Sequence, residues 1–247
     1  MDNEVINDLL GYDGLKIIQI PDAFNFSLDS TLLAHFVSIP KKTKRIIDLG
    51  CGNAPIPIFL TLRTNASVIG VEIQDEIADL AVKSVKLNHL EHQITILNKD
   101  MKNIYKLVGA NQFDVVTCNP PFFAFVESSN INKNDYLTIA RHEVKITLDD
   151  AVGEAKKLLV DGGVFAIVHR ANRLADCIDT FRKHHIEPKR IRFIYPKSSS
   201  VGALSVLIEG KKNGNSGGMK IMKPIYVLNS KGTYTKEILK IFNFPKE

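Results

Sequence analysis

Apolar positions along the chain follow two alternating patterns, and together they predict an α/β fold. Short apolar runs typical of buried strands occupy residues 45–49, 67–72, 93–98, 113–118 and 164–168. Between them, residues 75–88 and 148–159 carry apolar positions at helical spacing, and another helix is expected from Pro55. Strands that alternate with helices indicate a parallel, doubly wound sheet with helices on both faces.

The flanks add further elements to this core. We expect a strand at 15–20 and a helix at 28–39 before it, then a helix at 173–185, strands at 190–195 and 203–209, a short strand near residue 225 and a helix at 236–242. The last strands lack a crossover helix, which predicts antiparallel pairing at the sheet edge. We expect one domain over residues 1–247, divided into an N-terminal cap (1–44), a core (45–168) and a C-terminal sheet edge (169–247).

Composition limits the possible classes of protein. At 247 residues and 45% hydrophobic content, the chain fits one globular domain. Three widely spaced cysteines argue against a disulfide framework or a zinc site and fit a reducing cytoplasm. With no long apolar run and no signal-peptide pattern, we expect a cytoplasmic monomer without metal or membrane partner. The net charge of +5 is compatible with a nucleic-acid partner.

Glycines and acidic residues follow the first strands of the core. Asp48-Leu49-Gly50-Cys51-Gly52 ends the first strand, and its glycines allow a ligand to approach the backbone closely. Pro55 stands where a dinucleotide fingerprint has its third glycine, so this is a different loop. Glu72 ends the second strand and can accept both ribose hydroxyls of a nucleoside, while Asp100 follows the third strand and can accept an adenine amino group. Either acid alone reads equally well as a solvated strand end.

The sequence Asn119-Pro120-Pro121-Phe122 follows the strand at 113–118 and is the most informative motif. The Asn side-chain oxygen and a neighbouring main-chain carbonyl can accept the two hydrogens of a planar NH2 group, on which Phe122 can stack. Two prolines make this corner rigid and remove two donors. Alone, the motif is also compatible with a plain turn. Because the glycine turn, Glu72 and Asp100 also follow strands, a single cleft that contains all of these motifs is the better explanation, and this favours a binding site.

This set of motifs resembles the amino-methylating group of the class I S-adenosylmethionine-dependent methyltransferases. The resemblance implies a Rossmann-like, mostly parallel seven-stranded sheet with an antiparallel edge strand. It implies Asn119, Pro120 and Phe122 as catalytic residues. It also implies S-adenosylmethionine as cofactor, held by Asp48, Gly50, Gly52, Glu72, Asp100, Met101 and Asn119.

The flanking motifs narrow the resemblance. Residues 14–19, 24–30, 140–143 and 169–170 are similar to the bacterial tRNA adenine-N6-methyltransferases of the valine-tRNA type. This implies methylation of an adenine in tRNA, at position 37 next to the anticodon of a valine tRNA. The same resemblance suggests that the segment with Ser27 and Asp29 closes over the cofactor, although Asp29 can equally serve as a helix cap.

Basic residues suggest where RNA binds, and several alternatives remain. We expect Arg141, Arg170, Arg190 and Arg192 to contact RNA, within a basic cluster at 182–197 that a solvated helix and edge strand would also produce. The rival enzymatic functions are N5-methylation of a protein glutamine and N2-methylation of a ribosomal RNA guanine, the latter favoured by Phe122. The non-enzymatic rival is an RNA-binding module with a degenerate fold.

Overall fold

The structure is a computed structural model that describes residues 4–9, 14–20, 28–120 and 146–242. Phe122, Arg141 and Ser27 lie outside these residues.

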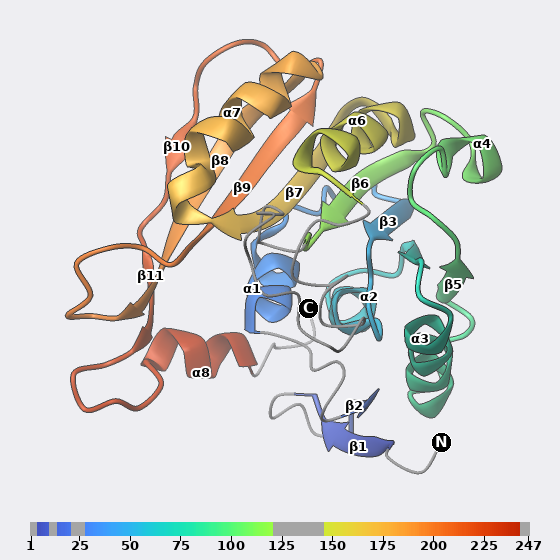
Figure 1. Cartoon of the computed structure of the whole chain (residues 1–247), viewed down its shortest axis with the longest axis horizontal. Helices are drawn as coiled ribbons and strands as arrows, with labels where there is room; N and C mark the ends of the chain where they lie inside the picture. The colour runs from blue at the N-terminus through green and yellow to red at the C-terminus, as the bar shows by residue number, and fades with distance from the viewer. Residues whose placement is uncertain (1–3, 10–13, 21–27, 121–145, 243–247) are drawn as a thin grey trace, which may run out of the picture.

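A mixed sheet of nine strands forms the centre of the molecule (Figure 1). The strand order is β10-β8-β9-β7-β6-β3-β4-β5, and β11 pairs with β8 beside β10. The strands are β3 (Arg45–Leu49), β4 (Ser67–Glu72), β5 (Ile94–Asn98), β6 (Phe113–Cys118), β7 (Leu159–Arg170), β8 (Ile186–Lys197), β9 (Ser205–Lys212), β10 (Lys220–Ile221) and β11 (Ile225–Leu228).

The mostly parallel sheet expected from the sequence is confirmed. The antiparallel strand is β9, which lies between β7 and β8, two places in from the edge formed by β10 and β11. The sheet has nine strands rather than the expected seven because the short β10 and β11 also pair in parallel with β8. Such short pairings leave little periodic signal in a sequence, so β10 was not expected.

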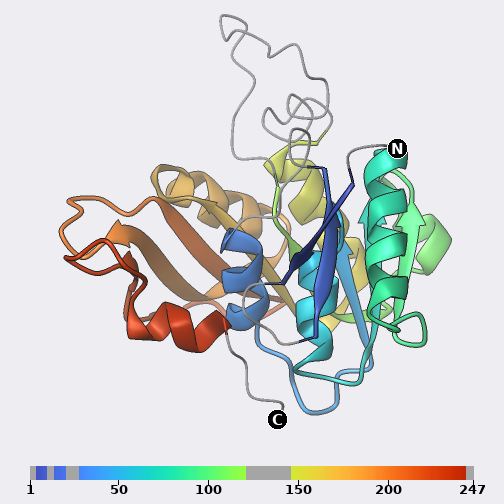
Figure 2. The ribbon, with the colours of Figure 1, turned by 90° about the horizontal axis from the view of Figure 1, so that it is seen from below.

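Helices cover both faces of the sheet. On one face lie α1 (Leu28–Phe36), α2 (Pro55–Thr61), α3 (Asp75–Leu87) and α8 (Lys236–Phe242); on the other lie α4 (Tyr105–Val108), α6 (Leu148–Leu158) and α7 (Leu174–Lys183), which the 3-10 turn η1 (Ala171–Arg173) precedes. Figure 2 shows α1, α2 and α3 side by side. Neighbouring strand residues belong to opposite cores: Ile46 lies in the hydrophobic cluster that includes Leu32 of α1, and Ile47 lies in the cluster that includes Phe165 of β7.

The N-terminal hairpin of β1 (Val5–Asp8) and β2 (Lys16–Gln19) is separate from the main sheet and packs on α3. Asn53 Nδ2 donates to Ile18 O at 2.9 Å, and Ser84 Oγ accepts from Ile18 N at 3.0 Å. Asn88 bonds both the amide and the carbonyl of Lys16. The N-terminal hairpin is therefore hydrogen-bonded both to the turn after β3 and to α3 with the residue that follows it.

Several element boundaries differ from the expected ones. The first helix ends at Phe36 rather than residue 39, and β7 starts at Leu159 rather than residue 164. Residues 161–163, between the helix expected at 148–159 and the strand expected at 164–168, lie within β7, where Gly162 has φ 75° and the pairing with β6 shifts between Phe113 and Val115. A glycine bend inside a strand gives the same local signal as a turn between elements.

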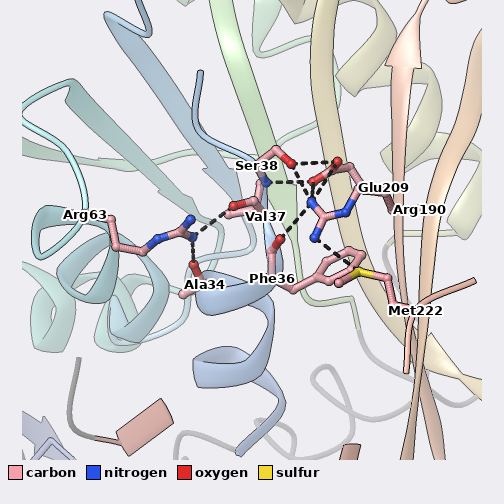
Figure 3. A network of polar contacts seen from close by, with 8 residues as sticks. All are labelled: Ala34, Phe36, Val37, Ser38, Arg63, Arg190, Glu209 and Met222. Atoms are coloured by element: carbon pink, nitrogen blue, oxygen red, sulfur yellow. Dashed lines mark hydrogen bonds and ion pairs between the residues drawn. The ribbon is translucent and has the colours of Figure 1, made fainter. Parts of the chain in front are cut away.

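Two guanidinium groups cap the C-terminal end of α1, as Figure 3 shows. Arg63 Nη1 donates to Ala34 O and, at 2.9 Å, to Val37 O. Arg190 Nη1 donates to Phe36 O at 3.2 Å, and its guanidinium lies 4.6 Å from the centre of the Phe36 ring. The last carbonyls of a helix lack partners within it and carry partial negative charge, so these cations stabilise the helix end.

Glu209 joins the same network from β9. Its carboxylate accepts from Ser38 N at 2.7 Å and from Ser38 Oγ at 2.9 Å, and it forms an ion pair with Arg190 at 3.0 Å. The side chain of Glu209 is only 3% exposed, against 25% for Arg190. A buried carboxylate needs such partners because its removal from water is costly.

We expect Arg190→Met to lower the free energy of unfolding by about 3 kcal/mol, because Glu209 would keep a buried charge without its cation. Urea unfolding measures this change. The matched control is Lys197→Met, which removes an exposed lysine from the same strand and should cost less than about 0.5 kcal/mol. Equal losses in the two variants would show that the ion pair has no specific role.

Candidate functional site

The ends of four parallel strands lie in one row and bring the predicted motifs to one edge of the sheet. Leu49 is paired with Val71 on one side and with Cys118 on the other, and Cys118 is paired with Ile167. A residue of a predicted motif follows each of the first three. Gly50 of the glycine turn follows Leu49, the predicted ribose acid Glu72 follows Val71, and Asn119 of the Asn-Pro corner follows Cys118. In a parallel sheet such C-terminal edges are where ligands bind.

The glycine turn has a backbone that other residues would strain. Gly50 has φ 72° and Gly52 has φ 56°, both in the left-handed region. The amides of Gly50 and Cys51 both donate to Val71 O at 2.9 Å, which fixes the turn against β4. A Cβ atom on Gly50 would lie 3.4 Å from Met101 Cε, so the turn and Met101 are in close contact.

Glu72 holds the turn from the neighbouring strand. Its Oε2 accepts from Gly52 N at 3.0 Å, and its Oε1 accepts from Gln74 N at 2.9 Å. The residue is 6% exposed. Burial raises the pKa of the Glu72 carboxyl, and the backbone hydrogen bonds oppose that rise. Each oxygen has a second lone pair, so the carboxylate can also accept from a ligand hydroxyl.

Asp48 is completely buried beneath the turn. Thr117 Oγ1 donates to its Oδ1 at 2.7 Å, and among the described residues none donates to Oδ2. Burial raises the pKa of the Asp48 carboxyl to about 8; the Thr117 hydrogen bond opposes this rise, and the charge of Glu72 adds to it. A polar atom without a protein partner at this edge is suited to a ligand donor.

Asp100 lies at the same edge, but its present contacts are local. It is exposed, and its Oδ1 accepts from Lys102 N at 2.8 Å, which closes its own turn. Pairing of Glu72 with Asn98 places the end of β5 next to that of β4. The structure therefore places Met101 against the glycine turn, while the contacts of Asp100 with the described residues stay within its own turn.

The Asn-Pro corner contacts the start of α1. Asn119 is partly buried and Pro120 is buried. Asn119 Nδ2 donates to Ser30 Oγ at 3.1 Å, and Ser30 is 4% exposed. This contact presents the other end of the amide, Oδ1, as an acceptor. No role for Ser30 or Thr117 was predicted from the sequence; a hydroxyl residue inside an apolar element was the available signal.

Asp29 and Arg170 lie close enough to interact electrostatically. Burial raises the pKa of the Asp29 carboxyl to about 6, and the positive charge of Arg170 opposes this rise. Arg170 ends β7 and Asp29 is the second residue of α1, so this predicted RNA contact lies near the Asn-Pro corner. The neighbouring His169 is fully buried, and its Nδ1 accepts from Arg170 N at 2.9 Å.

Arg190 and Arg192 occupy positions that differ from the expected RNA surface. Arg190 belongs to the network at the end of α1 (Figure 3). Arg192 is 11% exposed, donates to Lys223 O at 2.9 Å and pairs with Glu237. Both guanidinium groups therefore have intramolecular partners, and we assign them structural roles.

Of the other four arginines and lysines in the basic cluster at 182–197, three have partners, while Lys197 is exposed and none of the described residues pairs with its ammonium group. Arg182 pairs with Glu187 at 3.2 Å, Lys183 pairs with Asp149 at 2.8 Å, and Lys189 Nζ donates to Gly217 O at 2.7 Å. The sequence alone does not reveal which cations of a basic cluster have an acceptor within the fold.

Comparison with known proteins identifies the family. The family described as "Methyltransferase small domain" matches residues 25–193, which is more than half of the chain and includes every motif at the sheet edge. The chain belongs to this methyltransferase family. The match ends within β8, so the last part of β8, together with β9, β10, β11 and α8, lies outside it.

Similar curated proteins carry one name. The tRNA1(Val) (adenine(37)-N6)-methyltransferase of Yersinia enterocolitica is 26% identical over 59% of this chain, and the Porphyromonas gingivalis (strain W83) protein of that name is 29% identical over 68%. The chain spans 57% and 68% of their respective lengths.

Solved structures support the fold. A predicted O-methyltransferase from Agrobacterium tumefaciens has a TM-score of 0.68 at 20% identity, covering 87% of this chain and 95% of its own. The M. jannaschii tRNA m1G37 methyltransferase has a TM-score of 0.58 at 18% identity, and the match covers 86% of this chain and 58% of that structure's chain. The methyltransferase fold expected from the sequence is thus confirmed.

Among the described residues, no three His, Cys, Asp or Glu side chains are grouped in a way that would hold a metal ion. None of the described helices has the length and apolar character needed to cross a membrane.

We expect the stability of the protein to depend on the pH through Asp48. An Asp that ionises near 3.8 when unfolded and at about 8 when folded keeps an extra proton in the folded state between these values, so stability falls as the pH rises through this range. Asp48→Asn cannot ionise. Relative to wild type, its free energy of unfolding should increase by about 2 kcal/mol between pH 6 and pH 8 in urea titrations. A difference that stays constant with pH would show that Asp48 is ionised in the folded protein.

Proposed function

We propose that this protein transfers a methyl group from S-adenosylmethionine to N6 of an adenine in tRNA, at position 37 of a valine tRNA. One observation carries the proposal: Asn119, held by Ser30, lies at the same sheet edge as the glycine turn and Glu72. The names of the Yersinia and Porphyromonas relatives support the same reaction and substrate. A tRNA substrate places the protein in the cytoplasm.

The residues at the sheet edge fit S-adenosylmethionine. The left-handed glycines allow close approach, Glu72 can accept ribose hydroxyls, and Asp48 Oδ2 lacks a donor among the described residues. Asp100 and Met101 adjoin this position from the end of β5. When bound, the cofactor supplies a methyl group on a positively charged sulfur; every further requirement of the reaction falls on the protein and the acceptor.

The protein prepares the amine of the acceptor. An exocyclic amine conjugated with a ring is a weak nucleophile, because its lone pair is delocalised. Asn119 Oδ1 and the carbonyl of Pro120 would accept its two hydrogens, hold the nitrogen out of conjugation and stabilise the positive charge that develops on it. Phe122 would stack on the base, which contributes about 1–3 kcal/mol. The base must leave its stack, which costs least in a loop.

We expect Asn119→Ala to lower kcat for methyl transfer to unmodified tRNA by about 100-fold or more, because a preorganised acceptor at the developing charge is lost. Transfer of radiolabel measures this, and an unchanged thermal transition shows that the fold is intact. Ser30→Ala keeps the Asn119 acceptor but removes its hydrogen-bond partner, so we expect an intermediate loss. Wild-type activity in Asn119→Ala would exclude this mechanism.

Glu72→Ala should raise the Kd for S-adenosylmethionine about tenfold or more, because a hydrogen bond to a charged group contributes about 1.5–3 kcal/mol. Calorimetric titration measures the Kd. Glu91→Ala is the matched control: it removes an exposed acid between α3 and β5 and should leave the Kd unchanged. If the Glu72 variant binds like the control, Glu72 does not contact the cofactor.

A further inference from the structure

Nearly all of the net positive charge of the chain lies in one short segment at its C-terminal end. Residues 219–242, here called the C-terminal extension, comprise β10, β11 and α8. They contain five lysines and a single acid, Glu237, which gives a net charge of +4 out of +5 for the whole chain. The lysines are Lys220, Lys223, Lys231, Lys236 and Lys240.

These lysines differ from the basic cluster at 182–197 in their contacts. All five are exposed, and within the described residues none of their ammonium groups forms an ion pair. On α8, Ile238 and Ile241 are buried in the core beside α1. Lys236 and Lys240, four residues apart, share an outward face of that helix. The extension therefore presents uncompensated cations on an ordered scaffold.

Exposed aromatic rings lie among the cations. Tyr234, 46% exposed, stands between Lys231 and Lys236 and packs edge-on against Phe242 at 5.1 Å between ring centres. Tyr226 of β11 is 37% exposed and packs beside Tyr195 of β8 at 5.4 Å. Lysines interspersed with fixed aromatic rings are typical of surfaces that bind RNA phosphates and unstacked bases.

The sheet register places the extension at the same edge as the candidate site. Arg170 is paired with Ser205, Ser205 with Ile194, and Ile194 with Ile225. Three strand spacings of about 4.8 Å put Ile225 about 14 Å from Arg170 across the sheet. From there β11 continues past the end of β7, and α8 packs beside α1, whose first turn contacts the Asn-Pro corner (Figures 1 and 2).

We infer that the C-terminal extension is a docking surface for the phosphate backbone of the RNA substrate, and that it holds the stem next to the target nucleotide. The inference rests on the proposed function for the identity of the RNA and adds where that RNA is held. The extension lies outside the residues that the family matches, so it supplies substrate binding separate from the methyl-transfer core.

The test compares two triple variants with equal changes in charge. One replaces Lys231, Lys236 and Lys240 of the extension by Gln. The matched control replaces Lys41, Lys42 and Lys44, which are exposed lysines just before β3, at the opposite edge of the sheet. Fluorescence anisotropy gives the Kd for unmodified tRNA between 50 and 300 mM salt, and methyl transfer gives kcat and KM for the same tRNA.

We expect the extension variant to bind tRNA about tenfold more weakly than the control at the same salt, with the slope of log Kd against log salt reduced by about 2. The KM for tRNA should rise, while kcat and the Kd for S-adenosylmethionine stay unchanged. If the extension variant and the control bind tRNA equally, the inference is wrong, and an acidic protein becomes the better partner for this surface.

The binding assay separates this inference from the proposed function. If wild type methylates tRNA and the extension variant keeps its affinity, the docking surface is excluded and the proposed function stands. If wild type transfers no methyl group to tRNA but the extension variant alone loses tRNA affinity, the surface stands and the proposed reaction is excluded.

Discussion

Helix α1 is held at both ends, and this constraint links strands β8 and β9 to the candidate active site. At its C-terminal end, Arg63 and Arg190 satisfy carbonyls that the helix leaves without partners, and Glu209 fixes the following residue (Figure 3). At its N-terminal end, Ser30 accepts from the Asn119 amide. A short helix anchored in this way can keep the Asn119 amide in one orientation, because Arg190 and Glu209 belong to strands β8 and β9 rather than to loops.

The rest of the site is built from strand ends. Each parallel strand delivers one chemical group to the same edge: a left-handed turn after β3, an acid at the end of β4, and an amide after β6. Glu72 connects the first two because its carboxylate binds the turn itself. The same carboxylate that shapes the turn keeps lone pairs for a ligand, so in the proposed function the geometry of the loop would be coupled to cofactor binding.

Much of this arrangement was predictable from the sequence, because periodicity and motif position are local properties. The parallel arrangement of the core strands and the shared edge of Gly50, Glu72 and Asn119 followed from these local properties. The roles of the arginines did not, since the pairing of Arg190 with Glu209 and of Arg192 with Glu237 depends on contacts between distant segments. For the same reason the unpaired lysines of the C-terminal extension became evident only when the ion pairs elsewhere were known.

The most direct test of the proposed reaction is nucleoside analysis of bulk unmodified tRNA after incubation with the protein and radiolabelled S-adenosylmethionine. We expect label in N6-methyladenosine, because the Asn-Pro corner would orient the exocyclic amine of an adenine towards the methyl group. Label in N2-methylguanosine would contradict the assignment of the base. Label in protein glutamine, with none in tRNA, would contradict the assignment of the substrate.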